Sequence, residues 1–406
     1  MKDEKKAPKL RFKGFNDDWE QRKLGDVGET YTGLSGKTKE DFGHGEASFV
    51  TYMNVYSNPV SDLKMTEPIE IDNHQNEVKY GDVFFTTSSE TPEEVGMASV
   101  WTGNKNNTYL NSFCFGYRPL QKIDPYYLSY LLHSESVRRK IIILAQGISR
   151  YNISKKGVME ISTTFPSLDE QDQIGSLFQH IDHTITLHEE KKRQLERLKS
   201  ALMQKMFADK SGYPAVRFYG FSDKWEKRKL GDIFEERIEK SHNGSEELLS
   251  VTLKDGVVKA ESLDRKNNAS HDKRNYKLVF PNDIAYNSMR MWQGALGVSK
   301  YNGIVSPAYT IIKLKNQLEN PCFYQNYFKK YETLNVFRKS SQGLTSDTWN
   351  LKYPLFSRIH LFTTSSAEQQ NISSLLTLLD YNIALHGYKL ELLKKIKKFL
   401  LQSMFI

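Results

Sequence analysis

An internal repeat constrains the fold of this chain more than any other feature, because two similar segments must build two similar frames. Pro8–Asp26 reads PKLRFKGFNDDWEQRKLGD and Pro214–Asp232 reads PAVRFYGFSDKWEKRKLGD, with 13 of 19 positions identical. The match returns at the far ends of the two halves, at Glu170–Ile174 and Glu368–Ile372, and at Gln204–Phe207 and Gln402–Phe405. Between these ends the halves diverge almost completely. We therefore predict one frame built twice around two different interiors.

The last forty residues of each half predict a long helix with one apolar face. Apolar residues recur there at steps of three and four, the spacing of one helical face. In the first half they are Ile174, Leu177, Ile181, Ile185, Leu195, Leu198, Leu202 and Met206. In the second half they are Ile372, Leu375, Leu379, Ile383, Leu393, Ile396, Leu400 and Met404. Helices of about 38 residues would run roughly 57 Å, and each supplies the apolar partner that the other needs.

The interiors have a different pattern, which predicts mixed α/β domains. Short β-branched and aromatic runs such as Asp82–Thr87 and Tyr309–Leu314 alternate with Asn, Gly and Ser. One shorter helix is predicted in each interior, near Pro125–Ala145 and Pro321–Ser340. Trp19 and Trp225 are predicted to be buried plugs at the start of each half. The predicted domains are residues 1–168, a spacer helix at 169–209, residues 210–366, and a second spacer helix at 367–406.

Composition limits the class of protein. The net charge of +8 is too small for a polycation and suits a globular protein with basic faces. Two distant cysteines, Cys114 and Cys322, and scattered histidines predict neither a disulfide nor a metal site. The N-terminus has no apolar core of a signal peptide, and the longest aliphatic run, Ile141–Ala145, is far shorter than a membrane span. We expect a cytoplasmic protein without a membrane partner.

Three motifs resemble parts of enzymes but are incomplete. Gly33–Thr38 (GLSGKT) has Tyr31 where a P-loop needs its first glycine. Asp124–Tyr127 (DPYY) resembles an amino-methyltransferase tetrapeptide, but its counterpart NPCF also opens a helix, which favours a capping role for both. Asp72, Glu77 and Lys79 form only a weak nuclease pattern. A stand-alone nuclease or methyltransferase is therefore the less favoured alternative.

Two loops at matched positions carry side chains suited to DNA. Gln146–Ser154 reads QGISRYNIS and Gln342–Leu351 reads QGLTSDTWNL, each just after the interior helix. Such polar side chains hydrogen-bond base edges and phosphates, and glycine allows close approach to a groove. The candidate DNA contacts in these loops are Gln146, Ser149, Arg150, Asn152, Gln342, Thr345, Ser346 and Thr348.

Further candidate DNA contacts lie outside the two loops. Asn287–Gln293 (NSMRMWQ) adds Arg290 and Gln293, and the corresponding stretch Thr86–Glu90 (TTSSE) adds Thr86, Ser88 and Ser89. Lys37 and Lys39 are predicted to place positive charge near a phosphate backbone. The alternative for all these residues is that they form ordinary polar surface turns.

The repeated frame, with WExxKLGD at its head and EQxxI at each helix start, resembles the specificity subunit of Type I restriction–modification systems. Trp19–Asp26, Trp225–Asp232, Glu170–Ile174 and Glu368–Ile372 carry the resemblance, together with the QG loops. The resemblance implies two target recognition domains separated by two antiparallel coiled-coil helices, with an internal pseudo-two-fold repeat. It also implies that each domain recognises one half of an asymmetric split site in double-stranded DNA.

The same resemblance implies a non-catalytic subunit. It would recruit two adenine methyltransferase subunits that use S-adenosylmethionine and, in the full complex, ATP- and magnesium-dependent restriction subunits. No cofactor or metal is expected on this chain. A non-specific scaffold that bridges DNA through basic faces is the second alternative, and the target sequence itself cannot be derived from these residues.

Overall fold

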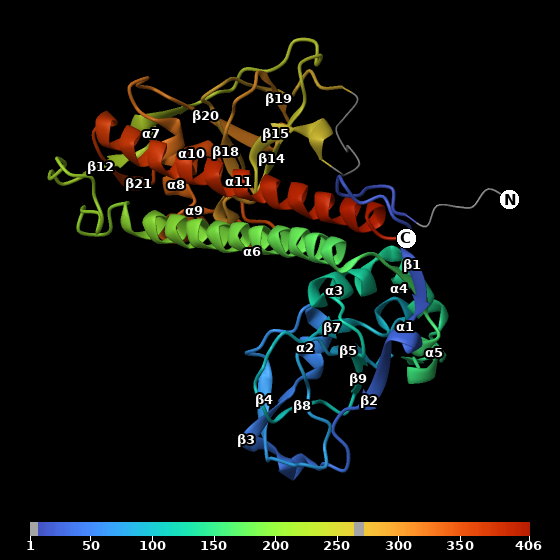
Figure 1. Cartoon of the computed structure of the whole chain (residues 1–406). Coiled ribbons are helices and arrows are strands. Elements are labelled where there is room, and N and C mark those ends of the chain that lie inside the picture. The colour runs from blue at the N-terminus through green and yellow to red at the C-terminus, as the bar shows by residue number, and fades with distance from the viewer. Residues whose placement is uncertain (1–6, 264–271) are drawn as a thin grey trace. The chain divides into compact units, whose positions relative to one another are not determined.

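The computed structural model describes residues 7–263 and 272–406 and divides into two compact units. The first unit comprises residues 1–189 and 387–406, and the second comprises residues 190–386. Both mix strands and helices, so the predicted mixed α/β class is confirmed. Two helices, α6 (Leu168–Lys205) and α11 (Ser366–Ser403), are the longest of the described elements (Figure 1). Each has 38 residues, as the apolar periodicity predicts.

The first unit is built on two small sheets and a set of short helices. A four-stranded antiparallel sheet has the order β2-β9-β5-β7, and a three-stranded sheet has the order β4-β3-β8. Two strand pairs, β1 with β11 and β6 with β10, complete the unit. The strands are β1 (Glu20–Lys23), β2 (Gly28–Thr32), β3 (Phe42–Val50), β4 (Thr66–Ile69), β5 (Val83–Thr86), β6 (Ser88–Ser89), β7 (Ala98–Val100), β8 (Thr108–Leu110), β9 (Cys114–Pro119), β10 (Tyr151–Asn152) and β11 (Ser162–Phe165). The helices are α1 (Leu24–Val27), α2 (Tyr52–Ser57), α3 (Pro125–His133), α4 (Glu135–Ile143) and α5 (Lys155–Met159).

The second unit repeats the four-stranded sheet of the first although its interior sequence is different, and its other described strands form three two-stranded pairs. Its four-stranded sheet has the order β13-β20-β17-β18, which corresponds strand for strand to β2-β9-β5-β7. The strands are β12 (Glu226–Lys229), β13 (Phe234–Glu236), β14 (Leu249–Thr252), β15 (Gly256–Lys259), β16 (Lys277–Val279), β17 (Ile284–Asn287), β18 (Leu296–Val298), β19 (Gly303–Val305), β20 (Tyr309–Leu314) and β21 (His360–Thr363). The helices are α7 (Leu230–Ile233), α8 (Pro321–Phe328), α9 (Tyr331–Ser340) and α10 (Tyr353–Phe356).

The interior helix of each half is two helices, so the prediction of one helix was wrong. In the first unit the backbone of Ser134 is extended, and its hydroxyl accepts the amide of Val137 at 3.4 Å as the cap of α4. A serine that caps a new helix ends the preceding one. The starts of α3 and α8 are confirmed as capped, since Asp124 accepts the amide of Tyr127 and Asn320 that of Phe323.

Each half is anchored by an arginine bound to a buried glutamate at the start of its long helix. In the first unit, Arg11 donates to Glu170 at 2.6 and 2.8 Å, and the indole of Trp19 donates at 3.2 Å. The Glu170 side chain is fully buried, and its hydrogen bond raises the pKa of the Arg11 guanidinium. Trp19 is 1% exposed, which confirms the predicted plug.

The second unit has the same anchor, but a different residue donates the third hydrogen bond to the glutamate. Arg217 donates to Glu368 at 2.7 and 2.8 Å. Here the hydroxyl of Thr364 supplies the third hydrogen bond, and the buried indole nitrogen of Trp225 has no partner among the described residues. Pro166 stands where the second half has Thr364, and proline offers no hydroxyl. The indole therefore takes the third position in the first unit.

A buried Met-Phe pair follows each long helix. Phe207 packs against Trp225, Phe323 and Tyr327 in the core of the second unit. Phe405 packs against Tyr127 and Phe178 in the core of the first. A backbone hydrogen bond also closes each frame, from Leu10 to Ser403 at 3.0 Å in the first unit and from Val216 to Lys205 at 2.9 Å in the second.

Within the first unit, the start of α6 packs against the end of α11. Ile181, Ile185 and Leu390 form a buried apolar seam. Asp182 of α6 pairs with Lys397 of α11, and the later residue Glu189 pairs with the earlier residue Lys394. These segments are therefore antiparallel. The second unit repeats the first of these pairs as Lys199–Asp380. No helix in the described part of the chain is long and apolar enough to span a membrane.

Candidate nucleic-acid interface

The QG loop of the second unit is a closed hairpin. Gln342 and Asn350 exchange backbone hydrogen bonds of 3.0 and 2.7 Å, which close the loop at its base. At its far end a turn joins Thr345 to Thr348, with the Thr348 amide donating to the Thr345 carbonyl at 3.0 Å. Gln342, Thr345, Ser346 and Thr348 are all exposed. The predicted contacts of this loop therefore lie on an accessible surface.

The loop packs beside the segment that contains Arg290 and Gln293. Trp349 in the loop meets Trp292 edge-on, with ring centroids 5.2 Å apart. Arg290 donates to Gln293 at 3.2 Å, and both side chains are exposed. A hollow of about 150 Å³ lies between the two segments, lined by Arg290, Trp292, Gln293 and Ser346, with Asn287, Met289 and Asp347. The structure thus brings together predicted residues that are more than fifty positions apart in the sequence.

The QG loop of the first unit has the same construction. Gln146 and Asn152 exchange two backbone hydrogen bonds of 2.9 Å each. Gln146, Ser149, Arg150 and Asn152 are exposed. The strand β10 at the end of the loop pairs with β6, which sets Asn152 opposite Ser88 and Tyr151 opposite Ser89.

Both loops are seated in the same way on their domains. In the first unit the amide of Ile153 donates to the carbonyl of Thr87 at 3.0 Å. In the second the amide of Leu351 donates to the carbonyl of Ser288 at 2.8 Å. The segments 86–90 and 287–293, which the sequence alignment placed in correspondence, thus hold their loops through equivalent contacts.

The glycine of each loop is required by the backbone. Gly147 has a φ of +143° and Gly343 a φ of +142°. A Cβ at these positions would lie 2.0 Å from the Arg150 carbonyl oxygen and 2.5 Å from that of Thr348. Any other residue would force each loop to open. Two different sequences therefore impose one loop geometry.

Not every predicted residue belongs to this surface. Thr86 is fully buried in β5, and its hydroxyl accepts the amide of Met97 at 3.0 Å, so it has no surface to offer DNA. Ser89 is 7% exposed, and its hydroxyl accepts the amide of Thr91. Ser88 is half-buried. Thr86 and Ser89 support the strands beside the loop rather than its accessible face.

The two lysines of the 33–39 segment also lie in a different setting. Lys37 is 15% exposed and pairs with Asp72 at 2.8 Å, a bond that holds the pKa of the Asp72 carboxyl well below its usual range. Lys39 begins a short 3₁₀ helix and is exposed. Lys37 is thus committed to an internal partner, whereas Lys39 keeps an accessible charge.

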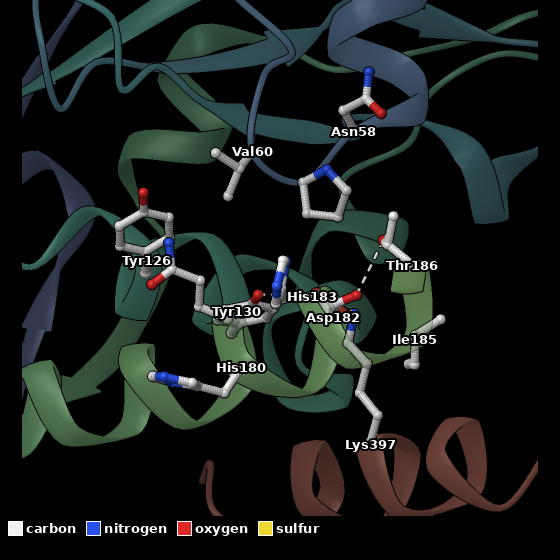
Figure 2. A pocket seen from close by; sticks show the side chains of 12 residues that line it. Asn58, Val60, Tyr126, Tyr130, His180, Asp182, His183, Ile185, Thr186 and Lys397 are labelled. Carbon is white, nitrogen blue, oxygen red and sulfur yellow. Dashed lines mark hydrogen bonds and ion pairs between the residues drawn. The ribbon is translucent and has the colours of Figure 1, made fainter. Parts of the chain in front are cut away.

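One cavity of the first unit belongs to the frame and not to the loops. It has about 640 Å³ and lies between α6 and the segment from Asn58 to Val60 (Figure 2). Tyr130 donates to Asp182 at 2.8 Å, and Lys397 reaches the same carboxylate from α11 (Figure 2). The predicted DNA contacts do not line this cavity. Its polar groups join the domain to the helices.

A buried histidine lies on the same helix as Tyr130. The ring Nδ1 of His133 contacts the carbonyl of Ser129 at 2.9 Å, and its Nε2 is buried without a partner among the described residues. Burial lowers the pKa of His133 to about 4. The imidazole is therefore neutral at pH 7, with its proton on Nδ1.

Comparison with known proteins agrees with this architecture. Residues 16–197 match the model of the type I restriction modification DNA specificity domain, a segment that includes the first QG loop and most of α6. Over these residues the chain is similar to the type I specificity subunits. The resemblance stated from the repeat is confirmed.

Individual relatives are distant in sequence. The chain is 26% identical over 199 residues to the candidate type I restriction enzyme MjaX specificity subunit of Methanocaldococcus jannaschii, an alignment that covers 47% of this chain and 46% of that relative. The chain therefore spans less than half the length of that curated relative.

Two solved structures share the fold. The crystal structure of the Type I restriction–modification S subunit from M. genitalium has a TM-score of 0.60 and 15% identity, covering 98% of this chain and 99% of that one. A structure solved in a study of complex assembly and conformational transition of the type I R-M system has a TM-score of 0.51 and 14% identity, covering 94% and 96% of the two chains.

The sequence prediction did not include the exposed apolar residue directly after the glycine of each loop, a position called the loop tip below. Ile148 is 97% exposed and Leu344 is 101% exposed, each directly after the loop glycine. The signal was present as a matched aliphatic residue in two otherwise polar loops. The candidate DNA contacts were hydrogen-bonding side chains, and an aliphatic side chain is not one.

Proposed function

We propose that this chain is a sequence-specific DNA-binding subunit that recognises a bipartite, asymmetric site, one half with each unit. The observation that supports it most is the pair of QG loops, which share one backbone geometry and present different side chains. A shared geometry suits a shared task, and different side chains suit different base sequences.

The residues divide into two groups by the contact each can make. Arg150 in the first unit, and Arg290 with Gln293 in the second, have side chains that form paired hydrogen bonds to base edges. Ser149, Thr345, Ser346 and Thr348 have hydroxyls suited to phosphates or bases, and Lys39 provides a phosphate contact. A good paired contact favours the correct base over a wrong base by about 1–3 kcal/mol, so several such contacts are needed per half-site.

The partners follow from the same proposal. The chain itself carries out no catalysis and binds no cofactor, and it brings two adenine methyltransferase subunits and the restriction subunits to the site. S-adenosylmethionine, ATP and magnesium then belong to those subunits. The repeated anchors, Arg11–Glu170 and Arg217–Glu368, give two frames of one kind, which suits docking of two copies of one partner.

Mapping of methylated adenines tests the proposal. Cells that contain the partner methyltransferase are compared with and without this chain, and a split methylated motif should depend on the chain. Arg150→Ala should relax the motif in one half only, and Arg290→Ala in the other half only. Arg274→Ala is the matched control, because this exposed arginine pairs with Asp272 and lies outside the candidate surface.

Three outcomes would count against the proposal. Equal relaxation of both half-sites by a single variant would exclude two independent readers. Binding that shows no sequence preference when salt is raised would favour the non-specific scaffold. Cleavage or methylation by the purified chain with DNA, magnesium and S-adenosylmethionine would favour the stand-alone enzyme.

Two changes to the chain test whether the interiors read the bases and the long helices set the spacing. Replacement of interior 28–165 with another interior of the same kind should change one half of the methylated motif and keep the other half and the spacing. Insertion of four residues near Lys192 adds about 6 Å of helix between Asp182 and Lys199, whose ion pairs belong to different units. It should alter the spacing or prevent assembly, without changing the bases read.

A further inference from the structure

At the tip of each QG loop, the position directly after the glycine, an aliphatic side chain is almost fully exposed to solvent. Ile148 is 97% exposed and Leu344 is 101% exposed. Each follows the loop glycine directly, so the two tips are equivalent positions of the repeat. Fully exposed aliphatic residues at one matched position of two otherwise different sequences indicate a shared contact with a partner.

The loops hold these side chains out on a fixed backbone. Each loop is closed at its base by two backbone hydrogen bonds and is tied to its domain through Ile153 or Leu351. The glycine before each tip has a φ that other residues rarely adopt. A rigid loop loses little conformational freedom when it binds, which favours insertion of its tip.

The residues that flank the tips along the chain have a charge that suits a nucleic acid. Gln146–Lys156 contains Arg150, Lys155 and Lys156 and no carboxylate. Arg338–Lys352 contains Arg338, Lys339 and Lys352 with the single carboxylate Asp347. An apolar tip between cations and hydroxyls fits a partner with a polyanionic backbone and apolar interior faces. Double-stranded DNA has both, since its phosphates are charged and its stacked bases have apolar faces.

From these observations we propose that Ile148 and Leu344 insert between stacked base pairs, one in each half of the DNA site. A side chain that is open on every side is enclosed only by a partner that surrounds it, and two neighbouring base pairs do so. Apolar wedges of this kind unstack base steps in other DNA-binding proteins. The proposal rests on the proposed function and extends it, because such a wedge makes recognition depend on the ease of deforming a particular step.

The experiment uses the full chain with its methyltransferase partner and duplexes that carry 2-aminopurine at successive positions of each half-site. The wild-type complex should raise 2-aminopurine emission at one step in each half. Ile148→Ser should abolish the rise in one half only, and Leu344→Ser in the other half only. Each variant should weaken binding by about 10- to 100-fold, the value of an aliphatic side chain that loses its buried contact.

Leu120→Ser and Leu318→Ser are matched controls. These leucines lie outside the loops, and they are 65% and 76% exposed. Both control variants should bind and unstack DNA as the wild type does. An equal loss in the controls would show that exposed apolar surface in general, and not the loop tips, is responsible.

Other results would overturn the proposal. Unchanged emission and affinity in both tip variants would exclude a DNA contact, and loss of methyltransferase binding alone would assign the tips to that protein. A loss of affinity reproduced by replacing thymine with uracil, without unstacking, would assign them to thymine methyl groups.

The design separates this proposal from the proposed function. If the chain binds DNA without any sequence preference, the recognition function fails, and the wedge is then judged on an arbitrary bound duplex. Loss of the unstacking signal in the I148S/L344S double variant would support the wedge even then. Retention of the signal in that variant, or no signal with the wild type, would refute it.

Discussion

Removal of Arg11 should destabilise the first unit far more than removal of a surface lysine. In the native state the fully buried carboxylate of Glu170 accepts two hydrogen bonds from Arg11 and one from Trp19. Arg11→Ala leaves that charge buried with the indole as its only remaining donor of the three. Breaking one side of a buried ion pair costs about 3–5 kcal/mol, which corresponds to a urea midpoint lower by about 2 M if the slope is about 2 kcal/mol per molar.

The assay is urea unfolding, monitored through the hydrogen exchange of peptides from each unit. Peptides of the first unit should lose protection at lower urea in Arg11→Ala, whereas peptides of the second unit should respond to Arg217→Ala. Lys23→Ala is the control, because Lys23 and Glu160 form an exposed pair, 52% and 60% accessible. Such surface pairs contribute little, so this variant should unfold like the wild type.

The double variant R11M/E170L separates a buried charge from lost packing. If the cost of Arg11→Ala comes from the stranded carboxylate, replacement of both partners by apolar residues should recover most of it. Unfolding of Arg11→Ala at the same urea concentration as Lys23→Ala would show that the buried ion pair does not stabilise the first unit. Equal instability of R11M/E170L and Arg11→Ala would show that the stranded carboxylate is not the source of the cost.

Three further predictions use the same unfolding assay or the methylation map. Trp19→Phe should cost about 1–2 kcal/mol more than Trp225→Phe, because only the Trp19 indole donates to a carboxylate; equal costs would contradict this. His133 has its pKa lowered to about 4 by burial, so the unfolded state binds a proton first as the pH falls below about 6.5. The first unit should therefore lose up to about 3 kcal/mol between pH 6.5 and 4, and His133→Asn should remove this part of the urea-midpoint change with pH. Gly147→Ala should disrupt recognition of one half-site through its clash with the Arg150 carbonyl, whereas Gly36→Ala, at an open position, should leave the motif unchanged.

The sequence predicted the frame well because the frame is repeated. Two copies of one pattern identify the long helices, the burial of Trp19 and Trp225, and the capping roles of Asp124 and Asn320. Each of these follows from local spacing or from a short motif that occurs twice. The shared order of the two four-stranded sheets could not be derived, because strand pairing joins residues distant in the sequence and the interiors have little similarity.

The misjudged residues show why polarity alone does not predict exposure. Thr86 is a hydroxyl residue in a fully buried strand, where a backbone amide satisfies its oxygen. Lys37 pairs with Asp72, 35 positions later, a contact that only the folded chain creates. The break at Ser134 depends on a serine that caps one helix instead of continuing another. In each case the side chain can occupy two different environments, and the tertiary structure determines which one it has.

The closing hydrogen bonds of the two frames have a topological consequence. In the second unit, the amide of Val216 donates to the carbonyl of Lys205 across a short stretch of continuous chain, whereas in the first unit the amide of Leu10 donates to that of Ser403, which is almost four hundred positions later. The same junction is thus covalent in one frame and non-covalent in the other. During synthesis the second frame can therefore close as soon as Val216 follows α6, whereas the first frame can close only after the end of α11 has been made.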